Sequence, residues 1–355
     1  MAGRGRLASG EFVGEVEGLT GEISRMRNQP FKVGGGLERK GQAAMGQDQD
    51  DSIYAPYTTV SKKLQRQQFV SEITVSAATA EAHDRNRDLR IEVVQAESPE
   101  HVLEVARSAD DAGWDALYLW DHVHRDPAEV TELADVWTML AAVATTTERI
   151  RLGPMVTPLS RRRLSVLIRQ TVTLDHLSGG RLTMGIGLGV DRAGELTRFG
   201  EVVDARTRAD ILDESVDLLI EAWAGETVTH RGEHRLIDGI AFRPRPIQRP
   251  GIPIWCAARG SALRPVRRAA RFQGLFLIEA DAEQLGRAIE EVASARGSLD
   301  GFDVAVVAPA PDDPQSHGTS VLEVPGVTWA VHMYPPDVAF DRALAAAKAG
   351  PRAAS

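Results

Sequence analysis

Hydrophobic and polar positions follow two alternating periods along most of the chain after residue 88. Short apolar runs, rich in Val, Ile, Leu and Trp, are typical of buried strands. A longer segment with apolar residues at helical spacing follows most of these runs. In Ser98–Gly113, for example, Val102 and Ala109 fall on one helical face, between a Ser-Pro start and a glycine stop. This alternation predicts parallel strands that are connected by helices.

Eight strands are predicted between residues 89 and 350. They are expected at Leu89–Val94, Asp115–Trp120, Arg149–Gly153, Arg181–Gly187, Ile252–Ala258, Gly274–Ala280, Asp303–Pro309 and Val327–Tyr334. An amphipathic helix at Arg206–Gly225 and a hairpin pattern at Glu226–Pro246 interrupt the alternation after the fourth strand. The pattern favours an α/β fold, a (β/α)8 TIM barrel with an insertion at about 190–250. An open doubly wound sheet is the alternative, and strand counting alone does not distinguish the two.

The first 88 residues differ from the rest because they show little sustained apolar periodicity. They contain a Gly34–Gly36 run and the polar stretch GQDQDD at Gly46–Asp51. We expect residues 1–88 to be a flexible or weakly ordered extension, and residues 89–351 to be the barrel domain. A dispensable tail is favoured over a lid or docking arm.

Composition and charge argue against a nucleic-acid-binding protein, a membrane protein and a disulfide-linked fold. The chain has 355 residues, 43% of them hydrophobic, and a formal net charge of −9. A negative chain is a poor candidate for binding nucleic acid or an anionic membrane. It has no apolar run of roughly 18 residues and no secretory signal pattern. Cys256 is the single cysteine, so an intrachain disulfide is impossible. A cytoplasmic location and small-molecule substrates are expected.

The residues that follow the strands are the first candidates for chemistry, because a (β/α)8 barrel carries its site at the carboxyl ends of its strands. Asp121 and His122 follow the second strand and are the catalytic candidates. A histidine can exchange a proton near neutral pH. Asp121 points the other way along an extended chain, so it could instead hold a loop. The same dipeptide at Asp175-His176 lies on a predicted outer helix, where a structural role is favoured.

Two glycine loops could approach a ligand. The run GIGLG places Gly187 and Gly189 after the fourth strand, without the spacing of a dinucleotide fingerprint. These glycines indicate either a close approach of a flat ring or a tight bend. The loop Ala258–Ser261 precedes a helix and offers a generic phosphate cradle, with an ordinary N-cap at Ser261 as the alternative.

Three arginines, Arg161–Arg163, begin the third predicted helix. Cations are unfavourable at this end of a helix dipole unless an anion compensates. A solvated basic face is the usual explanation. Local acidic residues such as Asp135, or the acidic tail of a ligand, are the alternatives. No spacing typical of a metal site, a P-loop or a Ser-His-Asp triad is present, so no metal is expected.

Several motifs together resemble the bacterial-luciferase-like monooxygenase family, and most closely its branch that uses the deazaflavin coenzyme F420. They are GWDALYLWDHV, ERIRLGPMVTPLSRRR, TLDHLSGGRLTMGIGLG, RPRPIQRPGIPIW and RPVRRAARFQG, which occur in order between residues 113 and 274. The resemblance implies a (β/α)8 barrel with an insertion after strand four. It also implies coenzyme F420, or FMN as the alternative, at the barrel mouth, and often a homodimer.

The resemblance also assigns roles to individual residues. It implies a cis peptide bond at Met155-Val156 beneath the cofactor ring, His122 beside that ring, and the Ala258–Ser261 loop at the phosphate. Contacts with the cofactor are therefore expected from Met155, Val156, Thr157, Gly187, Gly189, Ala258, Arg259, Gly260 and Ser261.

One departure from the family pattern, at Val190, bears on the substrate, and a second is Leu164, which stands where a proline commonly follows the three arginines. Val190 stands where some deazaflavin dehydrogenases carry a catalytic glutamate, which argues against a sugar-phosphate substrate. We predict an oxidoreductase that transfers a hydride, or inserts oxygen if it uses FMN, on a small organic substrate. The alternative is a non-catalytic or degenerate flavin-binding barrel.

Overall fold

The computed structural model describes residues 98–125, 133–309, 321–333 and 340–351, and before them only four short strands. The chain divides into two compact units, residues 1–68 and 69–355. In the first, β1 (Ile23–Met26) pairs antiparallel with β2 (Gln29–Lys32). The predicted weak order of residues 1–88 otherwise lies outside the described residues and stays a prediction.

The second unit is built on a ring of parallel strands. Its strands are β4 (Leu89–Val93), β5 (Ala116–Leu119), β6 (Arg151–Pro154), β8 (Met184–Gly187), β11 (Ile254–Arg259), β12 (Gly274–Ile278), β13 (Asp303–Pro309) and β14 (Trp329–Met333). Each pairs in parallel with its neighbours, and β14 returns to pair with β4. A parallel bridge between Leu152 and Leu182 joins β6 to β8. The pairing therefore closes on itself, as expected for a barrel and not for an open sheet.

Two further strands extend this ring. β7 (Thr157–Pro158) continues the chain after β6 and pairs in parallel with β8. β3 (Ile73–Ser76) pairs antiparallel with β4, so the sheet begins before Leu89, where the hydrophobic pattern first became regular. The pattern did not reveal β3 because four residues give too short an alternation of apolar and polar positions to recognise.

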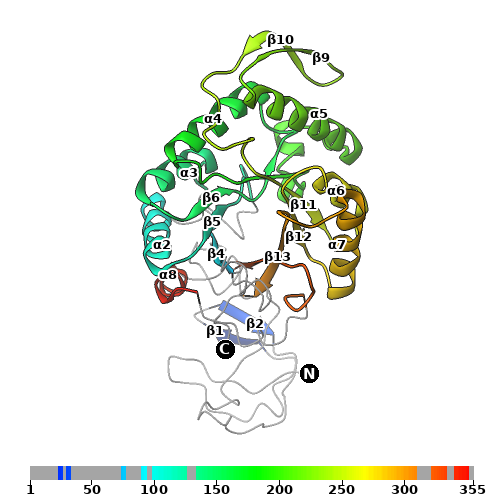
Figure 1. The fold of residues 1–355 in the computed structure, drawn as a ribbon. Coiled ribbons are helices and arrows are strands. Elements are labelled where there is room, and N and C mark those ends of the chain that lie inside the picture. Colours follow the sequence, from blue (N-terminus) through cyan, green and yellow to red (C-terminus); the bar gives the residue numbers. More distant parts are fainter. Residues whose placement is uncertain are drawn as a thin grey trace. The chain divides into compact units, whose positions relative to one another are not determined.

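Helices follow the strands and lie around the outside of the ring (Figure 1). They are α2 (Pro99–Ala112), α3 (Val136–Thr146), α4 (Leu164–Leu177), α5 (Ala205–Trp223), α6 (Leu263–Ala269), α7 (Ala282–Arg296) and α8 (Phe340–Ala349). α2 begins as its sequence predicts, with the Ser98 side chain accepting from the His101 N–H and Gly113 ending the helix in the left-handed region. α6 is shorter than the predicted Ala262–Gly274 helix.

The segment between β8 and β11 contains α5 and an exposed hairpin. Two 3-10 turns, η2 (Arg192–Gly194) and η3 (Thr197–Phe199), precede α5. The hairpin pairs β9 (Thr227–Arg231) with β10 (Leu236–Ala241) and projects beyond α4 and α5 (Figure 1). Glu214 of α5 fastens it by accepting from the ring Nε2 of His230 at 2.8 Å and from the His234 N–H at 2.9 Å.

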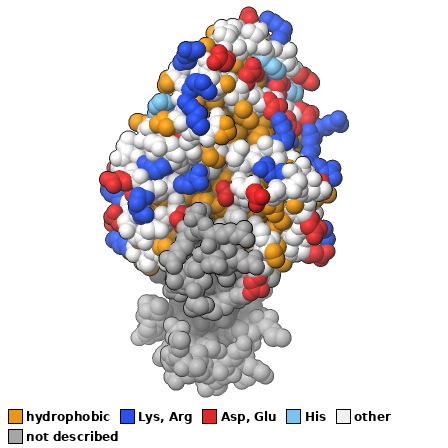
Figure 2. Space-filling view, viewed as in Figure 1, with side chains coloured by type: hydrophobic (Ala, Val, Ile, Leu, Met, Phe, Trp, Pro, Cys, Tyr) orange, Lys and Arg blue, Asp and Glu red, His pale blue; other side chains and the backbone are white. Residues whose placement is uncertain are grey.

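Charged side chains of both signs are interspersed around the face drawn in Figure 2, with hydrophobic side chains nearer its centre. Some surface charges join neighbouring outer helices. Arg264 of α6 lies 2.7 Å from Asp210 of α5, and Arg267 of α6 lies 2.6 Å from Glu291 of α7. Pairs as exposed as these contribute little stability individually. The helices are held on the ring mainly by the apolar layer beneath them.

Large side chains fill the interior of the ring. Tyr118, Trp255, Phe276 and Trp329 are fully buried there, and the Trp255 and Trp329 rings meet edge to face with centroids 5.3 Å apart. The next apolar residues toward the carboxyl ends of the strands are only half-buried: Val156, Ala257, Ile278 and Val307. The interior is therefore a packed core, and its apolar side chains become accessible to solvent at the carboxyl ends of the strands.

Glycines allow β6 and the loop after it to approach β8 closely. A Cβ atom on Gly153 would lie 1.9 Å from the carbonyl oxygen of Thr183, and one on Gly185 would lie 2.3 Å from that of Pro154. Neither distance is possible for a real Cβ. The glycines on these strands are thus required by contact between neighbouring segments of the ring itself.

We predict that Gly153→Ala lowers the free energy of unfolding by about 2 kcal/mol or more, because the new methyl group must displace the backbone of Thr183. The matched control is Gly286→Ala. A Cβ on Gly286, inside α7, meets nothing within 4 Å, so alanine there should leave stability unchanged or raise it by up to about 1 kcal/mol. Urea unfolding of both variants measures the difference, and equal effects would contradict this account of the ring.

Candidate active site

Asp121 lies just beyond the end of β5 and is buried. Its carboxylate accepts from the Thr157 hydroxyl at 2.8 Å, from Nε of Arg162 at 2.9 Å and from Nη2 of Arg161 at 3.1 Å. Arg161 also donates to the backbone carbonyl of Asp121. Of the two roles considered for Asp121, the contacts favour the loop-holding one, because its oxygens are occupied by donors from the segment after β6.

His122 is oriented by a carboxylate that the sequence analysis did not identify. Its Nδ1 lies 2.8 Å from Oε2 of Glu195, while the His122 side chain remains 22% exposed. Glu195 lies between η2 and η3, 73 residues further along the chain. No spacing rule connects two residues so far apart, and GELTRFG carries no motif of its own. The pairing is visible only in the folded chain.

Glu195 is itself held by two further donors. Its Oε1 accepts from the Val123 N–H at 2.7 Å and from Nη1 of Arg161. Burial alone would raise the pKa of Glu195. The hydrogen bond and charge of His122, the charge of Arg161 and the Val123 N–H outweigh that effect and lower the pKa to about 2. Glu195 is therefore ionised at neutral pH and can only accept hydrogen bonds.

The contacts of Arg161 and Arg162 answer the question raised by the three-arginine run. Arg161 pairs with both Asp121 and Glu195, and Arg162 pairs with Asp121. The compensating anions are therefore local carboxylates. Asp135, the partner suggested by the sequence, instead caps α3 by accepting from the Thr138 N–H.

The Met155-Val156 peptide bond is cis, as the family resemblance predicted. Met155 is buried in the interior cluster and Val156 packs on that cluster half-exposed. A Cβ on Gly187 would lie 2.6 Å from Cγ2 of Val156, and one on Gly189, where φ is +69°, would lie 3.0 Å from Cβ of Pro158. The packing of this segment accounts for both glycines, whether or not they also touch a cofactor.

The loop after β11 lies at the same end of the ring. Ala258 is buried, and exposed Arg259 forms an ion pair with Glu279 beyond the end of β12. Gly260 has φ of +53° and donates its N–H to the Ile278 carbonyl at 2.9 Å. Ser261 is exposed. It is not the N-cap of α6, which was the alternative to a phosphate cradle, because the N-cap position is taken by Ala262 and the helix begins at Leu263.

Asp175 and His176 have structural roles, as predicted from their place on an outer helix. The Asp175 carboxylate accepts from the Ile247 N–H at 2.6 Å and from the Gln248 side-chain amide at 2.7 Å. His176 contacts the Arg245 carbonyl through Nε2 at 2.8 Å. Both side chains fasten the segment before β11 against α4, far from the chemistry expected at the strand ends.

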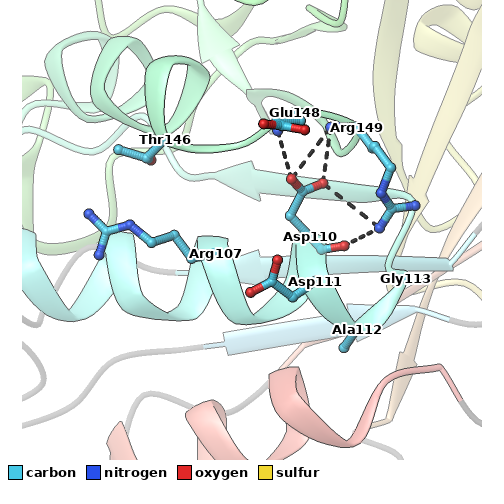
Figure 3. A pocket seen from close by; sticks show the side chains of 8 residues that line it. All are labelled: Arg107, Asp110, Asp111, Ala112, Gly113, Thr146, Glu148 and Arg149. Atoms are coloured by element: carbon cyan, nitrogen blue, oxygen red, sulfur yellow. Dashed lines mark hydrogen bonds and ion pairs between the residues drawn. The ribbon is translucent and has the colours of Figure 1, made fainter.

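A cavity of about 610 Å³ lies at the other end of the ring, between the end of α2 and the loop that leads into β6 (Figure 3). Asp110 is its central side chain. Its carboxylate accepts from the N–H groups of Glu148 at 2.6 Å, Ile150 at 2.8 Å and Arg149 at 3.1 Å. These bonds fix the turn before β6. This polar cavity therefore belongs to the scaffold and not to the candidate active site.

In the described part of the chain, no helix combines the length and the apolar character needed to span a bilayer. Among the same residues, no group of three or more His, Cys, Asp or Glu side chains could hold a metal ion.

Comparison with known proteins places these features in a family. A model of the family described as luciferase-like monooxygenase matches residues 74–311. Over 165 residues the chain is 30% identical to an F420-dependent glucose-6-phosphate dehydrogenase of Microbacterium testaceum, a match that covers 46% of this chain and 48% of the relative. The chain spans about half the length of the curated relatives that it matches.

Solved structures share the fold. An F420-dependent secondary alcohol dehydrogenase in complex with an F420-acetone adduct aligns with a TM-score of 0.55 and 19% identity, over 73% of this chain and 83% of that one. The oxygenating constituent of 3,6-diketocamphane monooxygenase of Pseudomonas putida, in complex with FMN, aligns with a TM-score of 0.52 and 19% identity, over 62% and 65% of the two chains. At these identities the alignments show a common fold only.

We predict that Asp121→Asn lowers the free energy of unfolding by about 3 kcal/mol, because two buried or half-buried guanidinium groups lose their shared carboxylate. The matched control is Asp238→Asn, which removes an exposed carboxylate of β10 and should change stability by less than about 0.5 kcal/mol. Urea unfolding at neutral pH compares the two variants. A loss no larger than that of the control would show that Asp121 does not hold the loops.

Proposed function

This chain belongs to the luciferase-like monooxygenase family, and from that membership we propose that it is an oxidoreductase that acts on a small organic substrate with a flavin-type cofactor, coenzyme F420 or FMN. The proposed site is the carboxyl end of the strand ring. The observation that carries the proposal is that His122, with its ring oriented by Glu195, lies at the same end of the strand ring as a half-buried apolar surface.

The apolar surface fits a flat ring system. Val156, Ala257, Ile278 and Val307 lie on the filled interior and remain partly accessible. The hydrogen bond from Thr157 to Asp121 joins the segment that carries Val156 to the loop that carries His122. A planar cofactor on this surface would therefore have an apolar floor and a titratable side chain at its edge, which is the environment that redox cofactors of this type need.

The polar part of the cofactor is assigned to the loop after β11. Arg259 is exposed there and offers a cation to a phosphate, in competition with its ion pair to Glu279. Ala258, Gly260 and Ser261 would contribute backbone contacts. Gly260 suits a close approach because it has no side chain, and its N–H, donated to the Ile278 carbonyl, holds the loop in place.

We favour coenzyme F420 over FMN. The relative of Microbacterium testaceum is described as F420-dependent, and its match with this chain is closer than those of the two structures. A bound deazaflavin supplies two-electron hydride transfer, whereas FMN would also supply chemistry with oxygen. Val190 is 43% exposed near the candidate site, where an apolar side chain suits an organic substrate better than a sugar phosphate.

The remaining segment after β8 is proposed to be the insertion of the barrel. Residues of about 190–250 leave the ring after β8, form α5 and the hairpin, and return at β11.

We expect the assembled enzyme to be a homodimer, which analytical ultracentrifugation would test. The barrel domain is proposed to extend to about residue 351.

The cofactor and His122 are tested together with purified full-length protein. Titration with coenzyme F420, followed by its fluorescence, is expected to saturate, and FMN should bind more weakly. The variant His122→Ala should lower turnover of a responsive substrate about 100-fold or more and leave cofactor affinity nearly unchanged, because it removes a proton-exchanging group and little of the apolar floor.

His176→Ala is the matched control, because it removes the histidine of the same dipeptide on α4 and should leave turnover unchanged. Binding of neither cofactor would overturn the proposal. Binding without turnover over a panel of alcohols, aldehydes and enones would support the alternative of a non-catalytic flavin-binding barrel. Equal turnover of the His122 variant and the wild type would contradict its assigned role.

A further inference from the structure

We propose that Glu195 is the positioning residue of His122: it fixes the proton on Nδ1 and leaves Nε2 as the atom that exchanges a proton with the substrate. This inference rests on the proposed function, because it names the residue that prepares His122 for that chemistry. It concerns residues of this chain only, so part of its test is independent of any cofactor.

The direction of the hydrogen bond follows from charge. Nδ1 of His122 and Oε2 of Glu195 are 2.8 Å apart, and an ionised carboxylate has no proton to donate. The proton between them must therefore be on Nδ1. In neutral His122 this leaves the lone pair on Nε2, which is the nitrogen on the side of the ring away from Glu195.

Glu195 is a rigid support because its position does not depend on His122 alone. The Val123 N–H and Arg161 hold its other oxygen. The segment that carries Glu195 is fixed on its own, since the Asp191 carboxylate accepts from the Leu196 N–H at 2.6 Å and from the Thr197 N–H at 3.0 Å. The carboxylate is therefore in place before a substrate arrives.

The charges of the ion-paired side chains around His122 sum to zero when His122 is neutral. Asp121 and Glu195 carry two negative charges, and Arg161 and Arg162 carry two positive ones. With neutral His122 the group has no net charge. A proton taken up at Nε2 during the reaction would add one positive charge to a ring whose other nitrogen donates to Glu195.

Further ionisable groups lie around this cluster. Arg125, in the loop that carries His122, lies 5.2 Å from the centroid of the Trp120 ring, and that ring meets the His122 ring edge to face. His124 lies in the same loop, and its Nε2 lies 3.4 Å from Nη1 of Arg198, a residue of η3. His124 and Arg198 are more exposed than Glu195, so their effect on the pair is screened more strongly by solvent.

With an alcohol as substrate, His122 would act as the proton acceptor. A bound oxidised cofactor would accept the hydride as the C–H bond of the alcohol breaks. The O–H bond of the alcohol would break with it, its proton passing to Nε2 of His122 while a C=O bond forms. Nδ1 keeps its own proton toward Glu195 throughout. In the reverse direction, Nε2 returns the proton to the carbonyl oxygen as the hydride arrives.

The first test is the tautomer of His122 in protein without cofactor. Nitrogen-15 NMR of histidine-labelled protein at pH 8 should show His122 with the proton on Nδ1, identified by loss of its signals in His122→Ala. In Glu195→Leu the signals should shift toward the Nε2-protonated form that free histidine prefers. An Nε2-protonated His122 in the wild type would overturn the proposal, whether or not any variant folds.

The second test compares the effect of Glu195 variants on kcat with their effect on cofactor Kd in the holoenzyme. Glu195→Gln should lower kcat at least about 10-fold, change the pH dependence of kcat/KM, and leave cofactor Kd within about threefold of the wild type. Glu195→Asp should recover part of the kcat loss, because it restores the negative charge. The control Glu221→Gln, on the exposed face of α5, should match the wild type.

The outcomes separate the two proposals. If neither coenzyme F420 nor FMN binds, the proposed function fails while the tautomer measurement still decides the role of Glu195. If the cofactor binds and His122→Ala is inactive, but Glu195→Gln keeps the kcat and pH profile of the wild type, the role of Glu195 is contradicted and the proposed function stands.

Discussion

The arrangement of the candidate site depends on one buried ionic interaction, the contact of Arg161 with both Asp121 and Glu195. It joins the loop after β5, the segment that follows β6 and β7, and the segment after β8. Each carboxylate would be costly to bury alone, and each guanidinium needs acceptors that the apolar core does not provide. Their mutual neutralisation allows three chain segments to meet at one end of the ring, and His122 takes its orientation from the result.

The filled interior of the ring explains why the site must lie at that end. Trp255, Trp329 and their neighbours occupy the centre, so no channel passes through the barrel. The apolar surface that they support is exposed only where the strands end. The glycines of β6 and β8 serve the same scaffold, because they bring two strands and the Met155-Val156 segment close enough to form a continuous floor.

Much of the fold could be predicted from the sequence, since the apolar period changes wherever a strand gives way to a helix. The strand ends, the position of His122 just beyond β5 and the cis bond at Met155-Val156 could also be predicted, the last only through family resemblance. Glu195 was not, because its partners are distant in the chain and a buried carboxylate looks like any surface glutamate in a sequence. For the same reason Asp135 was a plausible partner for the arginines until the fold placed Asp121 nearer.

The most direct test is a crystal structure of the protein with coenzyme F420 bound. We expect the deazaflavin ring to lie on Val156, with the His122 ring at its edge and Nε2 directed toward the reacting face. The same arrangement places the cofactor phosphate at the Arg259-Gly260 loop. A cofactor bound elsewhere, for example in the cavity beside Asp110, or a His122 ring that directs Nδ1 to the cofactor, would contradict it.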